Sequence, residues 1–490
     1  MINEQALRAE FDTIKHKIEA MRKEGKITPE LDAVITMLVT LLRVLMAVML
    51  EKAMRKNSNN SSLPPSQTDP DETKRSPARK KTRQEDDLVD NNALRKVTTE
   101  ETVTVAVCDQ CGADLSALAP HGHECRVIYD IIFTLTERRL TADIKDCPFC
   151  KAQTKGKFPA NMPGPRQYGT GIKALVITLL ISHMLSLRRA VALIKALCGQ
   201  TIAEATCLAW IQRLHEALGP WEQAARNQLL RRPALHADET GLRVDSKNYW
   251  MHGLTDGALS LKFLHPKRGR EAIDDIGIIP RYTGVLIHDC YQSYFGYDQC
   301  RHALCGSHLL RELTFVVDSN GYRWARLMKG VLREACHKIN QSAPKCLDED
   351  GYLGIRKRYR TILTQGKKEM PPVPRRTKGK RGRIAKSDAH NLLERFQQHE
   401  SSVLRFLRDP EVSFTNNPAE RCIRMSKVKI KVSGSFRTRK YAEMYCRISS
   451  YLQSMAADGY NPLTAITIAL AGGAADMVRE KEIPITDEDG

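Results

Sequence analysis

Residues 233–289 carry the pattern that most constrains the fold of this chain. Three short runs of strand-like composition come first, each followed by turn residues: 234–244, 249–254 and 259–265. A helix-like stretch at 268–276 follows, and then a fully apolar run at 284–288. This order predicts a meander of three strands, a crossover helix and a return strand parallel to the first.

Two aspartates occupy corresponding places in this predicted sheet. Asp238 lies in the first strand, and Asp289 directly follows the return strand. Because the return strand lies beside the first, we expect the two carboxylates to meet. The arrangement is the start of an RNase H-like α/β sheet. We predict it as a catalytic core in two parts, 233–306 and 409–455.

A third acidic residue, Glu420, stands in the segment 414–421, which reads Phe-Thr-Asn-Asn-Pro-Ala-Glu-Arg. Asn417 can cap a helix whose first residue is Pro418, and Glu420 then lies in the first turn. Asn417 and Glu420 also have capping-box spacing, so Glu420 taken alone would be interpreted as part of a helix cap. Together with the two aspartates it is better explained as a metal ligand.

Three carboxylates of this kind suit magnesium. Mg²⁺ prefers hard oxygen ligands and few protein groups, which leaves room for water and phosphate. Two ions about 3.5–4 Å apart can activate an attacking oxygen and stabilise a leaving one. The chain has no Walker motif, so an ATP-driven reaction has no support.

A long insertion separates the second and third acidic residues. Between Asp289 and Glu420 lie 130 residues, and the pattern at 307–408 is mostly helical, so we predict an inserted helical subdomain. Within it, residues 367–386 hold nine Lys or Arg and one Glu. A loop that contacts DNA is the functional interpretation, and a solvated charge run is the alternative. The candidate DNA contacts in this loop are Lys378, Lys380, Arg381 and Arg383.

Basic residues also follow Glu420 on its predicted helix. Arg424 is one turn from Glu420 on the same face and is a candidate for holding a phosphate near the metals. Lys427 is a further candidate DNA contact.

The formal net charge of +19 favours nucleic acid as a partner first and an anionic membrane second. A soluble basic protein with no special partner is the alternative. The 6% of aromatic residues does not favour a carbohydrate binder.

Two CxxC pairs predict a second metal site. They are separated by 35 residues and consist of Cys108, Cys111, Cys147 and Cys150. In a protein that is not secreted, cysteines should stay reduced, so CxxC pairs are better explained as metal ligands than as disulfides. Four thiolates suit structural Zn²⁺. We predict a variant zinc ribbon within a zinc-binding domain at 97–157, with four unmetallated thiols as the alternative. A second zinc at Cys305 and His308 is disfavoured.

The other segments are predicted from periodicity and composition. Residues 1–56 have apolar positions spaced alternately three and four apart, which indicates a coiled-coil arm, a helical hairpin or a helix packed on the rest. Residues 57–96 resemble a flexible basic linker. Residues 158–232 are predicted helical, with a helix-turn-helix-like pair that either binds DNA or belongs to a core. Residues 456–490 are predicted as a C-terminal tail.

Nothing in the sequence favours a membrane location. No signal peptide opens the chain, and the strongest apolar run, 35–50, contains Arg43. This run is shorter than a charge-free span of about 18 residues. We expect no membrane helix and a cytoplasmic protein.

Several longer motifs resemble those of one family, the DDE transposases of the bacterial insertion sequence 66 family. Besides the paired CxxC segment, the matching stretches are 57–66, 158–159, 167–169, 236–243, 249–252, 267–272, 288–289, 302–312 and 415–421. The resemblance extends from about residue 57 to 455. It departs at Cys290-Tyr291, where relatives commonly have an aromatic residue soon after the second aspartate, and in the C-terminal tail.

The resemblance implies a multidomain α+β protein with an RNase H-like core, a helical insertion and Mg²⁺ dependence, in which Mn²⁺ can substitute. Asp238, Asp289 and Glu420 match the catalytic trio, and His308 and Arg311 match a motif to which we assign a supporting role. The implied reaction is 3′-end cleavage at the inverted-repeat ends of a mobile element, followed by attack of the freed 3′-OH on target DNA. At least a dimer, accessory proteins of the same element and a place at the bacterial nucleoid are also expected.

Two other functions stay open at this point. One is a transposase-derived DNA-binding protein that has lost catalysis, against which the intact acidic trio argues. The other is a different RNase H-like nuclease, such as a junction resolvase. The ribbon, the arm and the large insertion argue against it.

Overall fold

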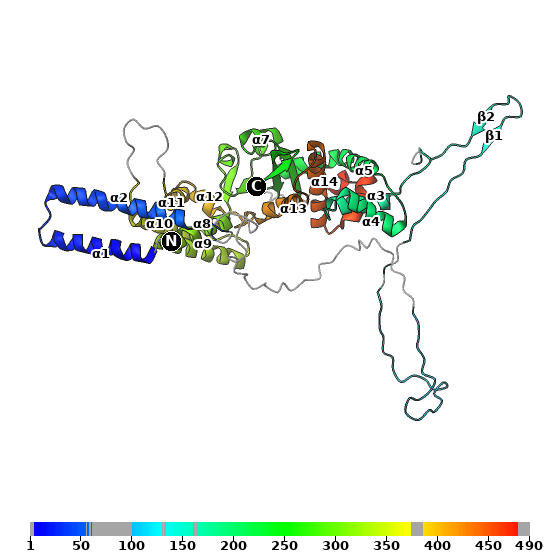
Figure 1. Cartoon of the computed structure of the whole chain (residues 1–490), viewed down its shortest axis with the longest axis horizontal. Helices are drawn as coiled ribbons and strands as arrows, with labels where there is room; N and C mark the ends of the chain where they lie inside the picture. The colour runs from blue at the N-terminus through cyan, green and yellow to red at the C-terminus, as the bar shows by residue number, and fades with distance from the viewer. Residues whose placement is uncertain are drawn as a thin grey trace, which may run out of the picture. The chain divides into compact units, whose positions relative to one another are not determined.

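The computed structural model describes residues 4–54, 56–57, 60, 100–129, 131, 134–159, 162, 164–373 and 386–478 (Figure 1). The chain divides into two compact units. One comprises Gln223–Cys446 with the N-terminal arm, and the other comprises Gln84–Glu222 with Arg447–Ile483. The predicted basic-loop residues Lys378, Lys380, Arg381 and Arg383 lie outside the described residues, as does nearly all of the predicted linker.

The first unit is built on a five-stranded sheet with the order β5-β4-β3-β6-β7. Its strands are β3 (Ala234–Val244), β4 (Lys247–Thr255), β5 (Ser260–His265), β6 (Val285–His288) and β7 (Arg301–Leu304). The first three form an antiparallel meander, β6 pairs in parallel with β3, and β7 pairs in parallel with β6. The predicted meander and parallel return strand are therefore confirmed. The strand β7 was not predicted.

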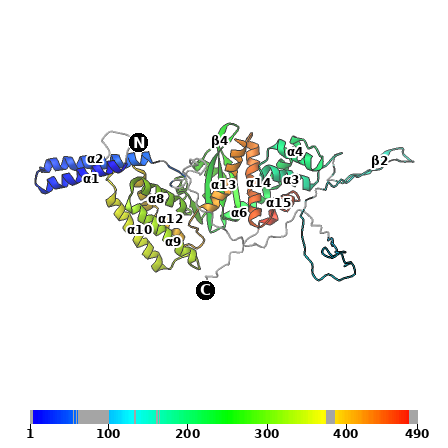
Figure 2. The same cartoon turned by 60° about the horizontal axis from the view of Figure 1, so that its bottom comes forward.

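Two helices are closely related to this sheet: one connects two of its strands, and the other packs on it. Helix α7 (Arg270–Ile276), with the short 3-10 turn η3 (Ile279–Arg281), forms the predicted crossover between β5 and β6. Helix α13 (Asn417–Ser433) packs on β3, β4 and β5, as Figure 2 shows in orange. Its buried positions, Ala419, Cys422, Ile423, Ser426 and Lys429, recur at helical spacing and face the sheet.

The segment between β7 and α13 is a helical subdomain, as predicted. Its helices are α8 (Gly306–Asn320), α9 (Arg323–Gln341), α10 (Glu349–Glu369), α11 (Asp388–Gln398) and α12 (Glu400–Leu404), with the 3-10 turn η5 (Arg405–Leu407). Buried side chains from these helices form one continuous apolar cluster with β6 and β7. A further 3-10 turn, η4 (Tyr294–Gly296), precedes β7. The subdomain is thus packed on one edge of the sheet.

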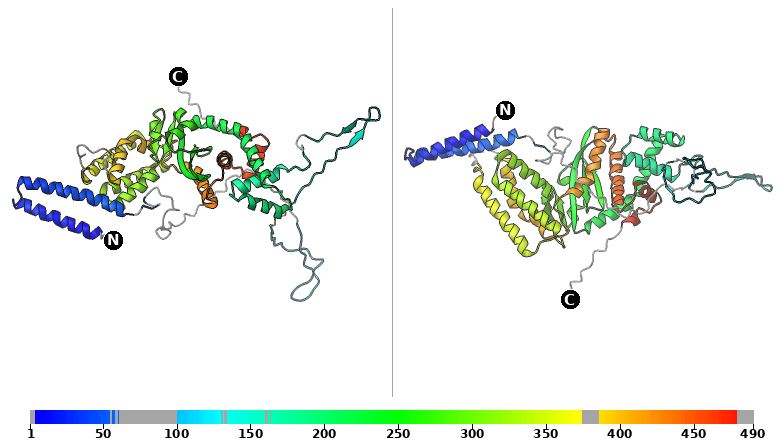
Figure 3. Two further views of the ribbon diagram at one scale, coloured as in Figure 1. Left: turned by 45° about the horizontal axis from the view of Figure 1, so that its top comes forward. Right: turned by 90° about the horizontal axis from the view of Figure 1, so that it is seen from below.

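The N-terminal arm is a helical hairpin, seen in blue in Figure 3. It consists of α1 (Glu4–Lys23) and α2 (Pro29–Ala53), joined near the turn by an ion pair of 2.6 Å between Arg22 and Asp32. At the far end of α2, the buried Glu51 carboxylate accepts hydrogen bonds from Asn320 of α8 and from the backbone N–H groups of Asp388 and Ala389. These contacts fasten the arm to the helical subdomain.

Most apolar side chains of α2 stay exposed, including Met37, Leu38, Leu41 and Leu45. By length and composition alone, Pro29–Lys52 could cross a membrane, although Arg43 still interrupts its apolar run. The same exposed face also suits pairing with another helix.

The second unit is mainly helical. It contains α3 (Thr170–Ile181), α4 (Leu187–Cys198), α5 (Glu204–Ala217) and α15 (Pro462–Leu470), with the 3-10 turn η6 (Ala475–Met477). Helices α6 (Gly219–Leu230) and α14 (Arg439–Ala457) run across the boundary between the units. The predicted helix pair, α4 and α5, packs together with α3, and α15 packs on α3 and α5. Residues 462–470 of the predicted tail are thus part of this helical core.

The two CxxC segments form similar turns in the second unit. The Cys108 N–H donates to Ala113 O and the Cys147 N–H donates to Ala152 O, each at 2.9 Å. The hairpin of β1 (Ile144–Asp146) and β2 (Gln153–Lys155) encloses the second turn. Between the two turns, the described residues of 127–140 form no strand.

Candidate active site

The parallel pairing of β3 with β6 brings the two aspartates near each other. His236 is opposite Ile287, and Asp238 and Asp289 each follow two residues later, close enough for the charge of Asp289 to act on Asp238. Each carboxylate accepts a hydrogen bond from a nearby backbone N–H, Asp238 from Glu239 at 2.9 Å and Asp289 from Tyr291 at 3.1 Å. Cys290, which directly follows Asp289, has a left-handed φ of 74°. Such backbone strain clusters at functional sites.

The start of α13 is bound directly to β3 through the fully buried Asn416. Its side-chain N–H donates to Ala237 O at 2.8 Å, and its side-chain oxygen lies 3.0 Å from His236 Nδ1. Burial lowers the pKa of His236 to about 4, so the ring is neutral. The residue immediately before Asp238 is therefore fixed to the helix that carries Glu420.

The helix begins one residue earlier than predicted, because Asn416 rather than Asn417 is its N-cap residue. The Asn416 N–H donates to Cys305 Sγ at 3.1 Å, and Glu420 Oε1 is buried without a hydrogen-bond partner. With Asn416 as the cap, the capping-box position three residues later is Ala419, so the capping-box alternative for Glu420 is wrong.

Close packing holds α13 against the strands at the level of the aspartates. Gly253 of β4 is opposite Asp238 of β3. A Cβ atom on Gly253 would lie 2.6 Å from a methyl group of Ile423 and 3.3 Å from Cys422 Sγ. The absent side chain lets the helix approach the sheet, and Glu420 lies one turn before these contacts.

Buried like charges perturb the first aspartate. Burial, helped by the neighbouring carboxylates of Glu239 and Asp289, raises the pKa of Asp238 to about 8, while Lys427 opposes this shift. Divalent cations would reverse it, because they favour the charged form of each carboxylate. The donor set of hard oxygens and the unpartnered Glu420 Oε1 also fit Mg²⁺.

Glu420 faces two residues of α8. Its Oε1 is 3.8 Å from His308 Nδ1 and 4.0 Å from the Arg311 guanidinium. The charges of Asp289 and Glu420 both act on the pKa of His308, against the larger effect of burial.

The acidic trio is spread more widely than a ligand cluster, however. In the described part of the chain, the one group with three ligand atoms all within 4.8 Å is Cys305, His308 and Glu420.

The comparison with known families bears on this arrangement. A family model described as "Transposase IS66 family" matches residues 166–444, more than half of the chain. The chain belongs to the IS66 family of transposases. No curated protein matches it.

In this IS66-family protein, the two predicted basic residues of α13, Arg424 and Lys427, differ in how closely their charges approach the carboxylates. Lys427 acts electrostatically on Asp238 and His308, which puts its charge near the carboxylates. Arg424 is exposed on the same helix. Both remain available to a phosphate backbone.

The predicted zinc ligands, which belong to the second unit, are not gathered into one cluster. Hydrogen bonds from backbone N–H groups and from the partner cysteine lower the pKa of Cys108 and of Cys147. Among the described residues, Cys108, Cys111, Cys147 and Cys150 supply no group of three ligand atoms within 4.8 Å. Each turn is thus formed separately.

Sequence reasoning missed the buried Glu239, next to Asp238. Tyr294 donates to it at 2.7 Å and Arg268 pairs with it at 2.7 Å. The Arg268 guanidinium lies over the Tyr291 ring, 4.1 Å from its centroid. A second acidic residue directly after Asp238 in the same strand was the available signal. Its partners were not readable from the sequence.

The raised pKa of Asp238 predicts how stability depends on pH without divalent cations. Between about pH 4 and 8 the folded protein keeps a proton that the unfolded chain releases, so the free energy of unfolding falls as pH rises. Asp238→Asn removes this contribution. In EDTA, its melting temperature should fall less than that of wild type between pH 6 and 9.

The exposed Asp298→Asn is the matched control and should behave as wild type. If Asp238→Asn and wild type lose the same number of degrees between the two pH values, Asp238 does not hold this proton.

Proposed function

We propose that this protein is an active transposase that cuts and joins DNA strands at the inverted-repeat ends of an insertion sequence, with two metal ions held by Asp238, Asp289 and Glu420. The pairing of β3 with β6 is the observation that carries the proposal, because Asp238 and Asp289 each follow a residue of one pair, His236 and Ile287, by two positions. The Asn416 bridge then ties the helix of Glu420 to the same strand. Family membership supports transposition as the process.

The sheet order and the helix α13 support an RNase H-like core. In the proposed site the three carboxylates would hold two Mg²⁺ ions, for which Mn²⁺ can substitute. When bound, such ions supply activation of the attacking oxygen and charge stabilisation of the leaving oxygen. The first step would be hydrolysis that frees a 3′-OH at the element end, and the second its attack on a target phosphodiester.

The surrounding residues have supporting roles in this proposal. His308 and Arg311 orient Glu420, which they face at 3.8 and 4.0 Å. Arg424 and Lys427 would contact the DNA backbone near the site. We assign further DNA contacts to the helical region 158–232 and to the basic-loop residues Lys378, Lys380, Arg381 and Arg383.

A structural zinc ion is proposed for Cys108, Cys111, Cys147 and Cys150. Apolar side chains around these cysteines are exposed, among them Val105, Ile128 and Phe149. A segment that buries so little apolar area lacks a core, and metal binding can supply the missing folding energy.

We propose that the exposed face of α2 pairs with α2 of a second copy. Leu38, Leu41 and Leu45 are each more than half exposed. Two element ends must be handled together, so a dimer fits the proposed reaction. Accessory proteins of the same element and a cytoplasmic, nucleoid-associated location belong to the same proposal.

Strand cleavage tests the catalytic trio. Asp289→Asn should lower the rate on oligonucleotides bearing the element ends by at least about a hundredfold, because it removes a metal ligand from the transition state. Mg²⁺ should support cleavage and the larger Ca²⁺ should not.

Asp298→Asn, which changes an exposed carboxylate in the same unit, is the control and should keep wild-type activity. Equal product from Asp289→Asn and wild type would refute the assignment. Binding of the ends without any cleavage by wild type would instead favour a DNA-binding protein that has lost catalysis.

Zinc content tests the ribbon. Cys108→Ser should remove most of the zinc that copurifies with the chain, since three remaining thiolates hold the ion more weakly. Cys198→Ser, at a half-buried cysteine on α4, is the control and should retain it. Unchanged zinc in Cys108→Ser would exclude this site.

Sedimentation tests the pairing of arms. Leu38→Glu with Leu45→Glu should convert a dimer into a monomer, because both changes place charge on the proposed seam. Arg43→Glu introduces a carboxylate at another exposed position of α2 and should leave the dimer intact. A double variant that sediments as wild type does would remove the arm from the interface.

A further inference from the structure

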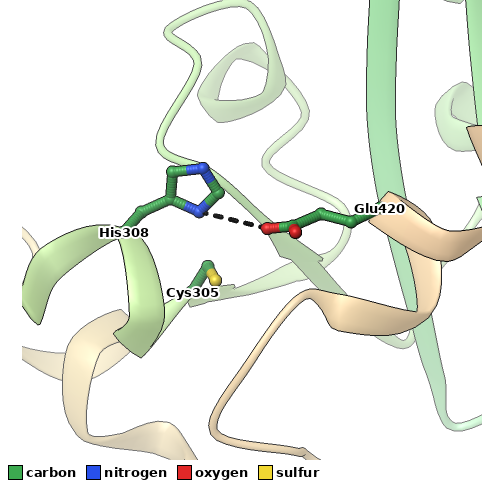
Figure 4. Close-up of side chains that lie close together, drawn as sticks. All are labelled: Cys305, His308 and Glu420. Carbon is green, nitrogen blue, oxygen red and sulfur yellow. Dashed lines mark ion pairs between the residues drawn. The ribbon is translucent and has the colours of Figure 1, made fainter. Parts of the chain in front are cut away.

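Three side chains with different donor atoms converge beside the acidic trio (Figure 4). Cys305 ends the β7 segment and is the N-cap residue of α8, His308 lies in the first turn of α8, and Glu420 lies in the first turn of α13. Their sulfur, nitrogen and oxygen atoms all lie within 4.8 Å of one another. The bond from the Asn416 N–H to Cys305 Sγ fixes the distance between the two helix starts.

Two of these donors are buried without hydrogen-bond partners. His308 Nδ1 and Glu420 Oε1 point towards each other at 3.8 Å, which is too long for a hydrogen bond. Leaving such buried atoms unsatisfied destabilises the fold. A cation bound by both would satisfy them together.

The donor set identifies the kind of cation. A thiolate, an imidazole and a carboxylate are typical ligands of Zn²⁺, whereas Mg²⁺ takes oxygen ligands almost exclusively. Three protein ligands also leave a fourth position of a tetrahedron for water.

The surroundings adapt the donors to this role. A His ring binds a metal in its neutral form, and burial favours that form by lowering the pKa of His308. Burial raises the pKa of the Cys305 thiol, but backbone N–H groups of Asn416, His308 and Ser307 stabilise the thiolate. Arg311, 4.0 Å from Glu420, opposes a cation, and the combined negative charge of thiolate and carboxylate offsets it.

We propose that Cys305, His308 and Glu420 form a site for a thiophilic divalent cation, Zn²⁺, that regulates the protein by withdrawing Glu420 from the magnesium ions. Glu420 belongs to both sets of ligands, so the two kinds of occupation compete. The binding of Zn²⁺ follows from the three side chains alone. The regulatory part rests on the proposed function.

Cobalt(II) is the probe for binding, because a cobalt–thiolate bond gives an intense charge-transfer absorption. The metal-free full chain is titrated with Co²⁺, which fills the ribbon cysteines as well as this cluster. Wild type should take up about one Co²⁺ more than Cys305→Ser, with a correspondingly larger thiolate absorption. Glu420→Gln should weaken the binding of that additional ion by at least about tenfold.

Cys300→Ser is the control, since Cys300 is a buried cysteine near the start of β7 and is not in the cluster. It should titrate as wild type does. Circular dichroism checks that every variant is folded, and the nearly isosteric Glu420→Gln decides the matter if Cys305→Ser is not. No thiolate absorption in wild type, or full uptake by folded Cys305→Ser, would overturn the proposal.

A second measurement separates regulation from the proposed function. With Mg²⁺ held constant, added Zn²⁺ should inhibit strand cleavage by wild type, and excess Mg²⁺ should relieve the inhibition. In Cys305→Ser, the ratio of cleavage with and without Zn²⁺ should rise towards one. Cleavage that Zn²⁺ does not inhibit would overturn the regulation alone, and no cleavage with any cation would count against the proposed function while the Co²⁺ result still decides the site.

Discussion

The side-chain amide of Asn416 and the backbone around it hold together segments that are far apart in the chain. The amide bonds to β3 at His236 and Ala237, and the backbone N–H bonds to Cys305 at the start of α8. All of these groups are buried, so each bond is made where its loss would leave a polar group unsatisfied. Strand, helical subdomain and α13 therefore keep one mutual arrangement, on which the position of Glu420 depends.

Electrostatic repulsion works against that arrangement. Asp238, Asp289 and the buried Glu239 gather negative charge at one edge of the sheet, and burial raises the pKa of Asp238 and of Glu239. Arg268 and Tyr294 stabilise Glu239 and leave the two aspartates without such partners. The negative charge of the two aspartates destabilises the fold, and divalent cations would neutralise it. The site is thus less stable without metals than with them.

The sequence predicted those parts that follow from local patterns. Strand alternation and turn residues gave the meander, the crossover and the parallel return strand, and helical periodicity gave the insertion. Long-range partners could not be predicted in this way. The acceptor of the Asn416 N–H, Cys305 Sγ, is 111 residues away, and the residues facing Glu420 come from a helix that starts after an unpredicted strand. The cap itself was misplaced by one residue because both Asn416 and Asn417 are good capping types.

The carboxylate of Glu51 gives the arm a mechanical meaning. It sits at the end of α2 and accepts hydrogen bonds from the first residues of α11 and from Asn320 at the end of α8. A helix that is hydrogen-bonded in this way at its base cannot turn freely against the subdomain. A partner that binds the arm and moves it would therefore also move α8 and α11.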